Sequence, residues 1–224
     1  MKMKKLALIT LVLFIALVSN AWATILYEYT GSLTGGGGSL ITNPNWQSGN
    51  GQTSLLWRVS YDDTTSLWTY NYTFNVAASP GISHVIIEVS NENISIASGS
   101  TPGLMDTYGT SPSNPGWPSN VSFPGIKWED LEGEYRWNWN VVTDRNPMWG
   151  DFYAKGGANT NLGYAYNSMF GTDTFGPIGD GNNGGWALVP DTDVVGKVPE
   201  PTTLILYGLG FAGAGLYRRL RRSK

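Results

Sequence analysis

Apolar and polar side chains alternate, residue by residue, through the central part of this 224-residue chain. From Leu67 to Val76, every second residue is aromatic or aliphatic, and the residues between them are threonine or asparagine. A period of two places the two sets on opposite faces of a β-strand, so that one face packs and the other meets water. The same alternation runs from Ser54 to Tyr61 and from Glu134 to Val142. The pattern therefore predicts half-buried strands.

Short polar turns separate these strands. Residues 62–66 are expected to close a hairpin between the first two, and further strands are expected at residues 25–33, 84–90, 123–128, 149–154 and 186–189. We find no convincing amphipathic helix between these strands. Strands that each bury one face need a second sheet to pack against. The predicted fold class is therefore all-β, an antiparallel β-sandwich, with the jelly roll as one arrangement.

The strand-rich part, residues 24–190, has the length of one domain. Glycine, proline and asparagine gather at residues 35–38 together with 43–51, at 98–118 and at 182–185, which we expect to be long polar loops. Residues 191–197 then form a linker. The sequence contains no internal repeat.

The N-terminus has the three parts of a secretory signal. A basic stretch at residues 2–5 precedes an apolar run over residues 6–18. Ala21 and Ala23 then form a small-x-small cleavage site. We therefore expect residues 1–23 to be a helical signal peptide that is removed, with an uncleaved N-terminal helix as the alternative.

The C-terminus joins three features in a fixed order. A proline-rich spacer comes first, an apolar run with four glycines over residues 204–217 follows, and a basic cluster ends the chain. As a helix, these 14 residues would span about 21 Å, which is short of the roughly 30 Å of a bilayer core. The basic side chains would stop translocation. A plain single-span anchor is the alternative. The residues are Val198, Pro199, Glu200 and Pro201 in the spacer, and Arg218, Arg219, Arg221 and Arg222 in the cluster.

This order of spacer, short apolar helix and basic end resembles the PEP-CTERM sorting signal of Gram-negative bacteria, here residues 198–224 with a transmembrane segment at 204–217. The resemblance implies an exosortase-type membrane protease as partner, which recognises and removes the tail. It also implies that the protein is held transiently in the inner membrane and is then delivered to the cell surface or extracellular matrix. The resemblance further implies a setting rich in extracellular polysaccharide, so an exopolysaccharide is the second expected partner.

The charge of the exported part differs from that of the whole chain. Residues 24–198 contain six basic and 16 acidic residues, a net charge of −10, whereas the full chain carries −3. Such a balance argues against nucleic acid as a partner. The chain has no cysteine, which excludes disulfides, thiolate metal sites and a cysteine nucleophile.

Few residues suggest chemistry. His84, the single histidine, lies in an apolar strand context and is interpreted as structural. Glu129, Asp130, Glu132 and Glu134 form an acidic cluster, which is where a glycosidase carboxylate pair would be sought. A solvated turn before the next strand explains the same cluster.

Residues 180–184 read Asp-Gly-Asn-Asn-Gly, which resembles part of a calcium loop but lacks its further acids. A glycine–asparagine turn is the plainer interpretation. No cofactor is expected, and a structural calcium ion is the one metal that we consider.

The function expected of the exported domain is therefore that of a non-enzymatic surface or matrix protein. A carbohydrate-binding module is the second hypothesis, with Trp137, Trp139 and Trp149 as flat surfaces for sugar rings. The same tryptophans would serve equally as core residues, because one face of every strand must be buried. A glycoside hydrolase that uses the acidic cluster is the third hypothesis.

Overall fold

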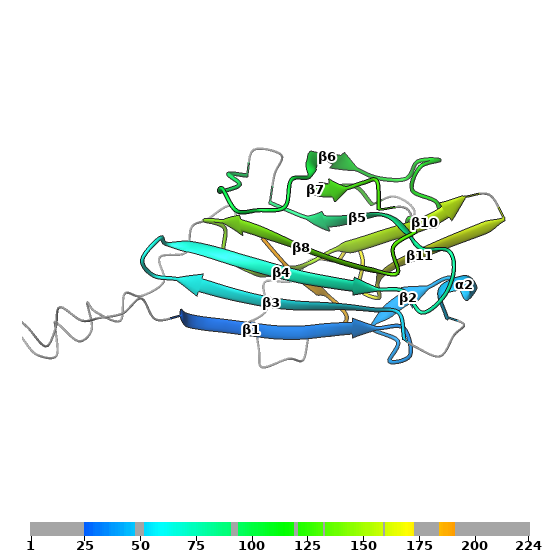
Figure 1. Cartoon of the computed structure of the whole chain (residues 1–224), viewed down its shortest axis with the longest axis horizontal. Helices are drawn as coiled ribbons and strands as arrows, with labels where there is room; N and C mark the ends of the chain where they lie inside the picture. The colour runs from blue at the N-terminus through cyan, green and yellow to red at the C-terminus, as the bar shows by residue number, and fades with distance from the viewer. Residues whose placement is uncertain are drawn as a thin grey trace, which may run out of the picture. The chain divides into compact units, whose positions relative to one another are not determined.

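The computed structural model describes residues 25–47, 52–90, 94–118, 121–131, 133–158, 160–172 and 184–190. The chain divides into two compact units, residues 1–193 and 194–224, and all the described residues belong to the first. They form three antiparallel sheets and one short helix, α2 (Pro44–Gln47) (Figure 1). The signal helix and the C-terminal transmembrane helix that we expected lie outside the described residues.

The first sheet has four strands in the order β1-β3-β4-β8. Its core-facing residues alternate with polar residues that face water, as the sequence predicts. The β3–β4 hairpin pairs Asp62 with Leu67 and Ser54 with Asn75 without a register shift, which confirms the predicted turn. The strand bounds are β1 (Ile25–Thr34), β3 (Ser54–Asp62), β4 (Leu67–Asn75) and β8 (Arg136–Thr143).

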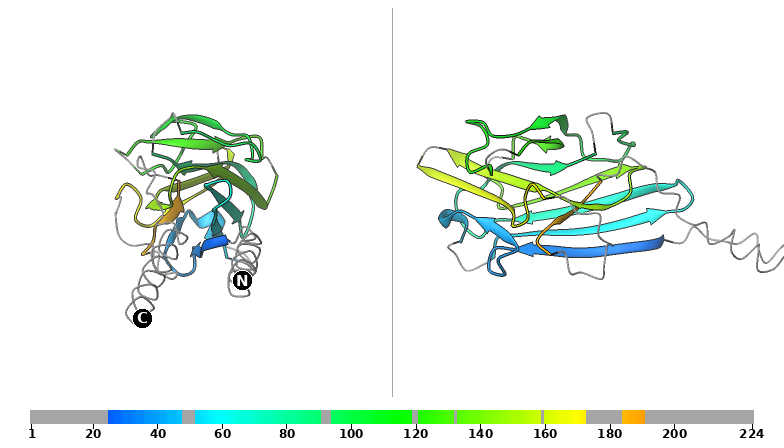
Figure 2. Two further views of the ribbon diagram at one scale, coloured as in Figure 1. Left: turned by 90° about the vertical axis from the view of Figure 1, so that its left-hand side faces the viewer. Right: turned by 180° about the vertical axis from the view of Figure 1, so that it is seen from behind.

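The second sheet has six strands in the order β2-β11-β10-β5-β7-β6. A two-stranded ribbon, β9 with β12, forms the third sheet. Figure 2 shows the four-stranded and six-stranded sheets as two stacked layers. The bounds are β2 (Leu40–Thr42), β5 (Ile82–Glu88), β6 (Leu104–Tyr108), β7 (Phe123–Trp128), β9 (Met148–Gly150), β10 (Phe152–Ala158), β11 (Asn161–Asn167) and β12 (Ala187–Val189).

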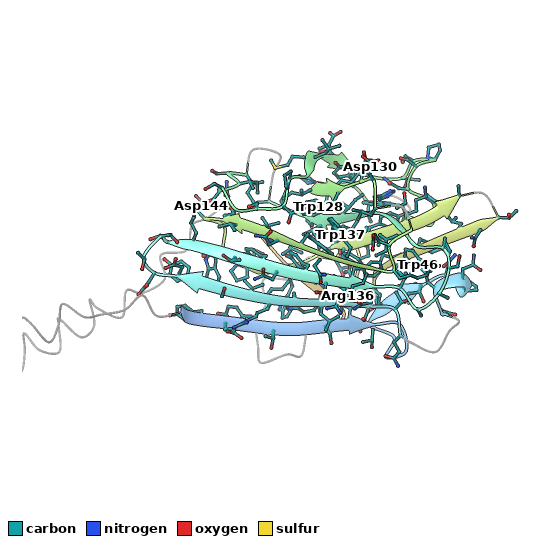
Figure 3. The ribbon with its side chains drawn as sticks, in the orientation of Figure 1. Trp46, Trp128, Asp130, Arg136, Trp137 and Asp144 are labelled. Atoms are coloured by element: carbon teal, nitrogen blue, oxygen red, sulfur yellow. The ribbon has the colours of Figure 1, made fainter. Side chains whose placement is uncertain are left out.

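Aromatic side chains fill the space between the two large sheets (Figure 3). The ring of Phe74 in β4 lies 5.1 Å from that of Phe152 in β10. At the other side, Trp139 in β8 lies 5.6 Å from Trp128 in β7. Aromatic pairs at such distances add to the stabilisation that burial alone provides. These contacts confirm the predicted β-sandwich.

The helix α2 supplies one core residue that the strand pattern does not reveal. Trp46 is completely buried, packs edge-on against Phe74 at 5.6 Å, and donates its indole N–H to the Pro80 carbonyl at 2.7 Å. A Cβ at Gly163 in β11 would overlap the Trp46 ring. The glycine therefore makes room for the tryptophan.

A second apolar cluster covers the outer face of the six-stranded sheet. Trp117 comes from the long segment between β6 and β7 and lies 4.8 Å from Tyr153 in β10. The Tyr153 hydroxyl donates to the Pro115 carbonyl at 2.7 Å, which ties the segment to the sheet. As a result β5 is buried on both faces. The cluster consists of Ile86, Trp117, Phe123 and Tyr153, with Tyr108, Val121, Tyr164, Tyr166 and Phe170 packed against it.

Several expectations need correction. The region 98–118 contains strand β6 and packs on the sheet through Trp117, so it is not simply a polar loop. Likewise, α2 lies within residues 43–51, β2 lies between the two parts of the first predicted loop, and β11 was not expected. The strand expected at 149–154 is two strands, because the chain bends at Asp151. The described residues form twelve strands, and the jelly-roll arrangement stays a prediction.

Candidate functional site

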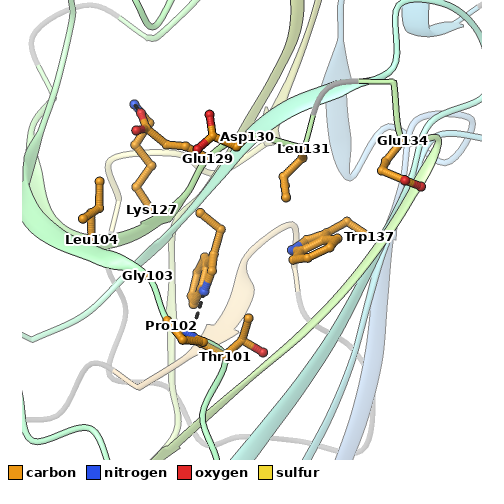
Figure 4. A pocket seen from close by; sticks show the side chains of 11 residues that line it. Thr101, Pro102, Gly103, Leu104, Lys127, Glu129, Asp130, Leu131, Glu134 and Trp137 are labelled. Atoms are coloured by element: carbon orange, nitrogen blue, oxygen red, sulfur yellow. Dashed lines mark hydrogen bonds and ion pairs between the residues drawn. The ribbon is translucent and has the colours of Figure 1, made fainter.

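A pocket of about 560 Å³ lies between residues of both large sheets. Strand β8 forms one edge of the four-stranded sheet, and β6 and β7 lie at one edge of the six-stranded sheet. The walls come from residues 101–104, the end of β7, the turn that follows it, and the start of β8. Figure 4 shows the acidic side chains at one side of the pocket and residues 101–103 at the other.

Backbone contacts hold the turn that carries the carboxylates. Asp130 has φ 59°, in the left-handed region that aspartate tolerates better than most residues. The Leu131 side chain is buried, and its N–H donates to the Ser83 carbonyl in β5 at 3.2 Å. The Glu134 carbonyl accepts a hydrogen bond of 2.7 Å from the first residue of β5. The turn is therefore fixed to the sheet, and the side chains of Glu129, Asp130 and Glu134 remain exposed.

The charges in the pocket are only partly balanced. Glu129 forms an ion pair with Lys127, and the hydrogen bond from this ammonium group lowers the pKa of the Glu129 carboxyl. Lys127 also lies 5.9 Å from the centre of the Tyr108 ring, within the range of a cation–π contact. Among the described residues, Asp130 and Glu134 form no ion pair. The pocket wall is therefore net negative.

The acidic cluster lacks the signature of a glycosidase acid at Glu129. Such an acid must hold its proton near neutral pH, which requires a raised pKa. The Lys127 ammonium shifts the pKa of Glu129 in the opposite direction. Glu132, the fourth member of the predicted cluster, lies outside the described residues.

The three tryptophans considered as sugar-stacking surfaces have different environments. Trp139 is 3% exposed and stacks on Tyr72 at 5.2 Å, and Trp149 is 5% exposed. Both rings belong to the core and offer no exposed surface, because their strands direct them inward. Trp137 is half-buried and lines the pocket. Its indole nitrogen has no acceptor among the described residues, so no hydrogen bond there fixes the ring.

A smaller pocket of about 190 Å³ adjoins the first and shares residues 101–103 and Trp128 with it. Its remaining wall is largely apolar and includes Ile96, Ala97, Met105, Ile126 and Val141. Residues 97–101 run beside β8, where Ala97 N–H donates to the Val142 carbonyl at 2.8 Å and Thr101 N–H to the Asn140 carbonyl at 3.0 Å. Residues 98–101 belong to the region that the sequence predicts to be a polar loop, so the sequence does not indicate their contact with β8.

His84 lies in β5 and is 4% exposed. Burial is the main cause that lowers its pKa to about 3, and the positive charges of Lys127 and Lys155 add to the effect. The negative charge of Glu129 and the nearby Asn114 side chain oppose the shift only in part. The imidazole is therefore neutral at physiological pH and packs 6.0 Å from the Tyr153 ring. This environment agrees with the structural interpretation of the histidine.

A buried polar network at the β9–β10 bend escaped the sequence reasoning. The Asp151 carboxylate accepts from Asn167 Nδ2 at 3.0 Å and from the Gly171 N–H at 2.7 Å. Glu88 Oε2 accepts from the Asp151 N–H at 2.7 Å. Both carboxylates are buried, and their hydrogen bonds go to backbone and amide donors that hold the bend. The network is structural, and its one sequence signal is an aspartate between two aromatic-rich strands.

Other predicted sites fall outside the described residues. These are residues 180–183 of the candidate calcium loop, the cleavage-site alanines Ala21 and Ala23, and the whole of residues 198–224. Within the described ranges, no three His, Cys, Asp or Glu side chains gather as metal ligands. In the same ranges, no helix has the length and apolar character needed to cross a membrane.

Comparison with known proteins identifies one feature. The family model of the PEP-CTERM protein-sorting motif matches residues 197–222, which cover the signal predicted at residues 198–224 except for its last two residues. The chain therefore carries this motif, which implies export and processing by exosortase, a membrane protease. No curated protein and no solved structure matches the chain.

Proposed function

We propose that this carrier of the PEP-CTERM motif is a non-enzymatic protein of the cell surface or extracellular matrix that associates with exopolysaccharide. The sorting motif at residues 197–222 is the observation that carries the proposal. It brings the chain to the outside of the cell through a membrane-anchored intermediate. The strongly acidic, cysteine-free body fits a role in that setting.

The polysaccharide contact that we propose is the pocket lined by Trp137, Glu134 and residues 101–104. Its volume of about 560 Å³ lies in the range of small-ligand sites. The partly exposed Trp137 ring supplies an apolar surface for a sugar ring, and the exposed carboxylates accept hydrogen bonds from hydroxyl groups. This combination favours carbohydrate binding as the molecular activity of the sandwich.

A hydrolase is the weaker alternative. The Lys127–Glu129 ion pair favours the ionised carboxylate at the position where a proton donor would be needed. If Glu134 nevertheless acted as a catalytic group, Glu134→Gln would abolish hydrolysis of a polysaccharide that the wild-type protein degrades.

The sorting part of the proposal is tested by Glu200→Ala in the native host. Glu200 lies between Pro199 and Pro201, and proline disfavours helix both at its own position and at the residue before it. We expect the variant to accumulate in the membrane fraction with its tail attached, while the body remains folded. Thr202→Ala, two residues further on, is the matched control and should be processed normally. Normal processing and surface delivery of the Glu200→Ala protein would contradict the proposal.

The binding part is tested with the exopolysaccharide of the native host. We expect the full chain, purified in mild detergent, to co-sediment with this polymer, and Trp137→Ala to weaken the association several-fold. The matched control is Tyr135→Ala, because Tyr135 is 50% exposed and does not line the pocket. Equal co-sedimentation of the Trp137→Ala and wild-type proteins would exclude the pocket as the contact.

A further inference from the structure

From the two adjoining pockets we infer that the preferred ligand is a polysaccharide of amino sugars, in which some amino groups are free and others are N-acetylated. This inference rests on the proposed function and adds the chemical class of the ligand. It is carried by the uneven charge of the larger pocket and by the apolar character of the smaller one.

The charge of the larger pocket favours a cationic ligand. Lys127 is paired with Glu129, whereas Asp130 and Glu134 form no ion pair among the described residues. Polymers of uronic acids or sulfated sugars would bring further negative charge to this wall, and like charges at an interface cost affinity. A sugar ammonium group instead pairs with either carboxylate, and an indole face such as that of Trp137 is the best aromatic partner for a cation.

The smaller pocket favours an apolar substituent on the ligand. Its wall presents Ile96, Ala97, Met105, Ile126 and Val141, and it holds about 190 Å³. The pocket is also lined by Ser98, Ser100 and Thr101. The hydroxyl groups of Ser100 and Thr101 already form hydrogen bonds with Ala97, Val142 and Asn140, which leaves them little capacity to bind the hydroxyl groups of an unsubstituted sugar. The methyl group of an acetamide would be removed from water there, while its N–H and carbonyl can bond to backbone groups of residues 98–103.

The two pockets have part of their walls in common, so that one polymer can contact both. They share Thr101, Pro102, Gly103 and Trp128. The absence of a side chain at residue 103 keeps the chain close to the sheet, because a Cβ there would lie 2.6 Å from Ile126 Cγ2 and 2.9 Å from Trp128 Nε1. A ligand that spans both pockets therefore places a charged group beside the carboxylates and an acetyl group beside Ala97.

The test is binding of defined oligosaccharides to the full chain in mild detergent, measured by calorimetry. The probes are hexamers with one β-1,4 backbone: partly N-acetylated glucosamine, fully deacetylated glucosamine and unsubstituted glucose. We expect the partly acetylated hexamer to bind at least tenfold more tightly than the glucose hexamer. Each exposed carboxylate is expected to contribute about a two- to fivefold gain, with the acetyl group supplying the rest.

Two variants separate the contributions of the pockets. Asp130→Asn combined with Glu134→Gln should weaken binding of the deacetylated hexamer roughly tenfold at low salt and leave the glucose hexamer nearly unchanged. Ala97→Leu fills part of the smaller pocket and should weaken only the acetylated ligand. Asp63→Asn is the control for lost charge. Asp63 lies in the β3–β4 turn at one end of β4, whereas the start of β8 pairs with the other end of β4. Unchanged thermal midpoints will show that the variants are folded.

The outcomes distinguish this inference from the proposed function. If the glucose hexamer binds as tightly as the amino-sugar hexamers, the inference is overturned, and polysaccharide binding stands. If none of the hexamers binds and the host polymer does not co-sediment, both are overturned. If the ranking is as expected but the pocket variants behave as wild type, the ligand class stands, and its assignment to these pockets is wrong.

Discussion

The two large sheets differ in how many of their faces are buried. The four-stranded sheet buries one face and leaves the other in water, so that Phe74 in β4 is buried and its neighbour Thr73 is not. The six-stranded sheet is covered on both faces over its centre, and the neighbours Ile86 and Ile87 in β5 are both completely buried. In a sheet with one solvent-exposed face, apolar and polar residues alternate along each strand. A sheet that is buried on both faces lacks this alternation.

The comparison predicts the largest loss of stability at Phe74. This ring contacts both Phe152 and Trp46 between the sheets. We expect Phe74→Ala to reduce the free energy of unfolding by about 3–5 kcal/mol, because it removes a buried aromatic group and leaves a cavity. Urea denaturation of the folded body is the measurement. A loss below about 1 kcal/mol would show that the two sheets do not pack through this ring.

Ile86 and Ile87 test whether β5 is buried on both sides. Ile87 faces the other sheet, and Ile86 lies under Trp117 and Phe123 in the outer cluster. We expect Ile86→Ala and Ile87→Ala each to cost about 2–5 kcal/mol in the same experiment. If Ile86→Ala costs as little as a surface substitution, the covering segment does not pack on this face, and the contrast between the sheets disappears.

Acid should lower the stability of the folded protein through His84, which lies in β5. Its pKa is about 3 in the folded protein and about 6.5 when unfolded, so the unfolded chain binds more protons between these values. The stability present above pH 6.5 is therefore lost progressively as the pH falls toward 3, by up to about 3 kcal/mol at pH 4.

His84→Gln removes this contribution and is the variant to compare. Lys127, Lys155, Glu129 and Asn114 surround the histidine and stay in place in the variant. Unfolding curves at pH 7 and pH 4 should differ less for His84→Gln than for the parent chain. Equal losses in the two proteins would assign the acid sensitivity to other groups.

The smallest effect is expected on the wet face of the four-stranded sheet. Thr73 Oγ1 hydrogen-bonds to Asn138 Oδ1 at 2.7 Å, where water competes for both groups. We expect Thr73→Ala to cost less than about 1 kcal/mol. A loss similar to that of Phe74→Ala would mean that this face is also covered.

The same contrast explains which strands the sequence predicts. β3, β4 and β8 alternate, with Leu56 as an exposed exception, because their outer faces meet water. β11 was missed although Tyr164 and Tyr166 alternate with small residues, because its inward side holds Gly163 to admit the Trp46 ring. That ring comes from a four-residue helix with no helical period to detect. Strand β6 was missed because it is an exposed edge among prolines and glycines, with Leu104 60% exposed.

The candidate site was predicted in part for the same reason. The carboxylates of Glu129, Asp130 and Glu134 lie within six residues and stand out in the sequence. The opposite wall at residues 101–104 comes from a segment whose position depends on hydrogen bonds to Asn140 in β8, and local sequence carries no signal for that pairing. The burial of Trp139 could not be separated from the exposure of Trp137, because both lie on the same face of one strand.

The central claim is that the sandwich is the exported product of a precursor that is trimmed at both ends. Intact-mass spectrometry of the protein recovered from the cell surface or medium of the native host tests it most directly. We expect the main species to begin at Thr24 and to lack the tail that follows the Pro199-Glu200-Pro201 spacer. A main species that retains Met1 or ends at Lys224 would contradict the account.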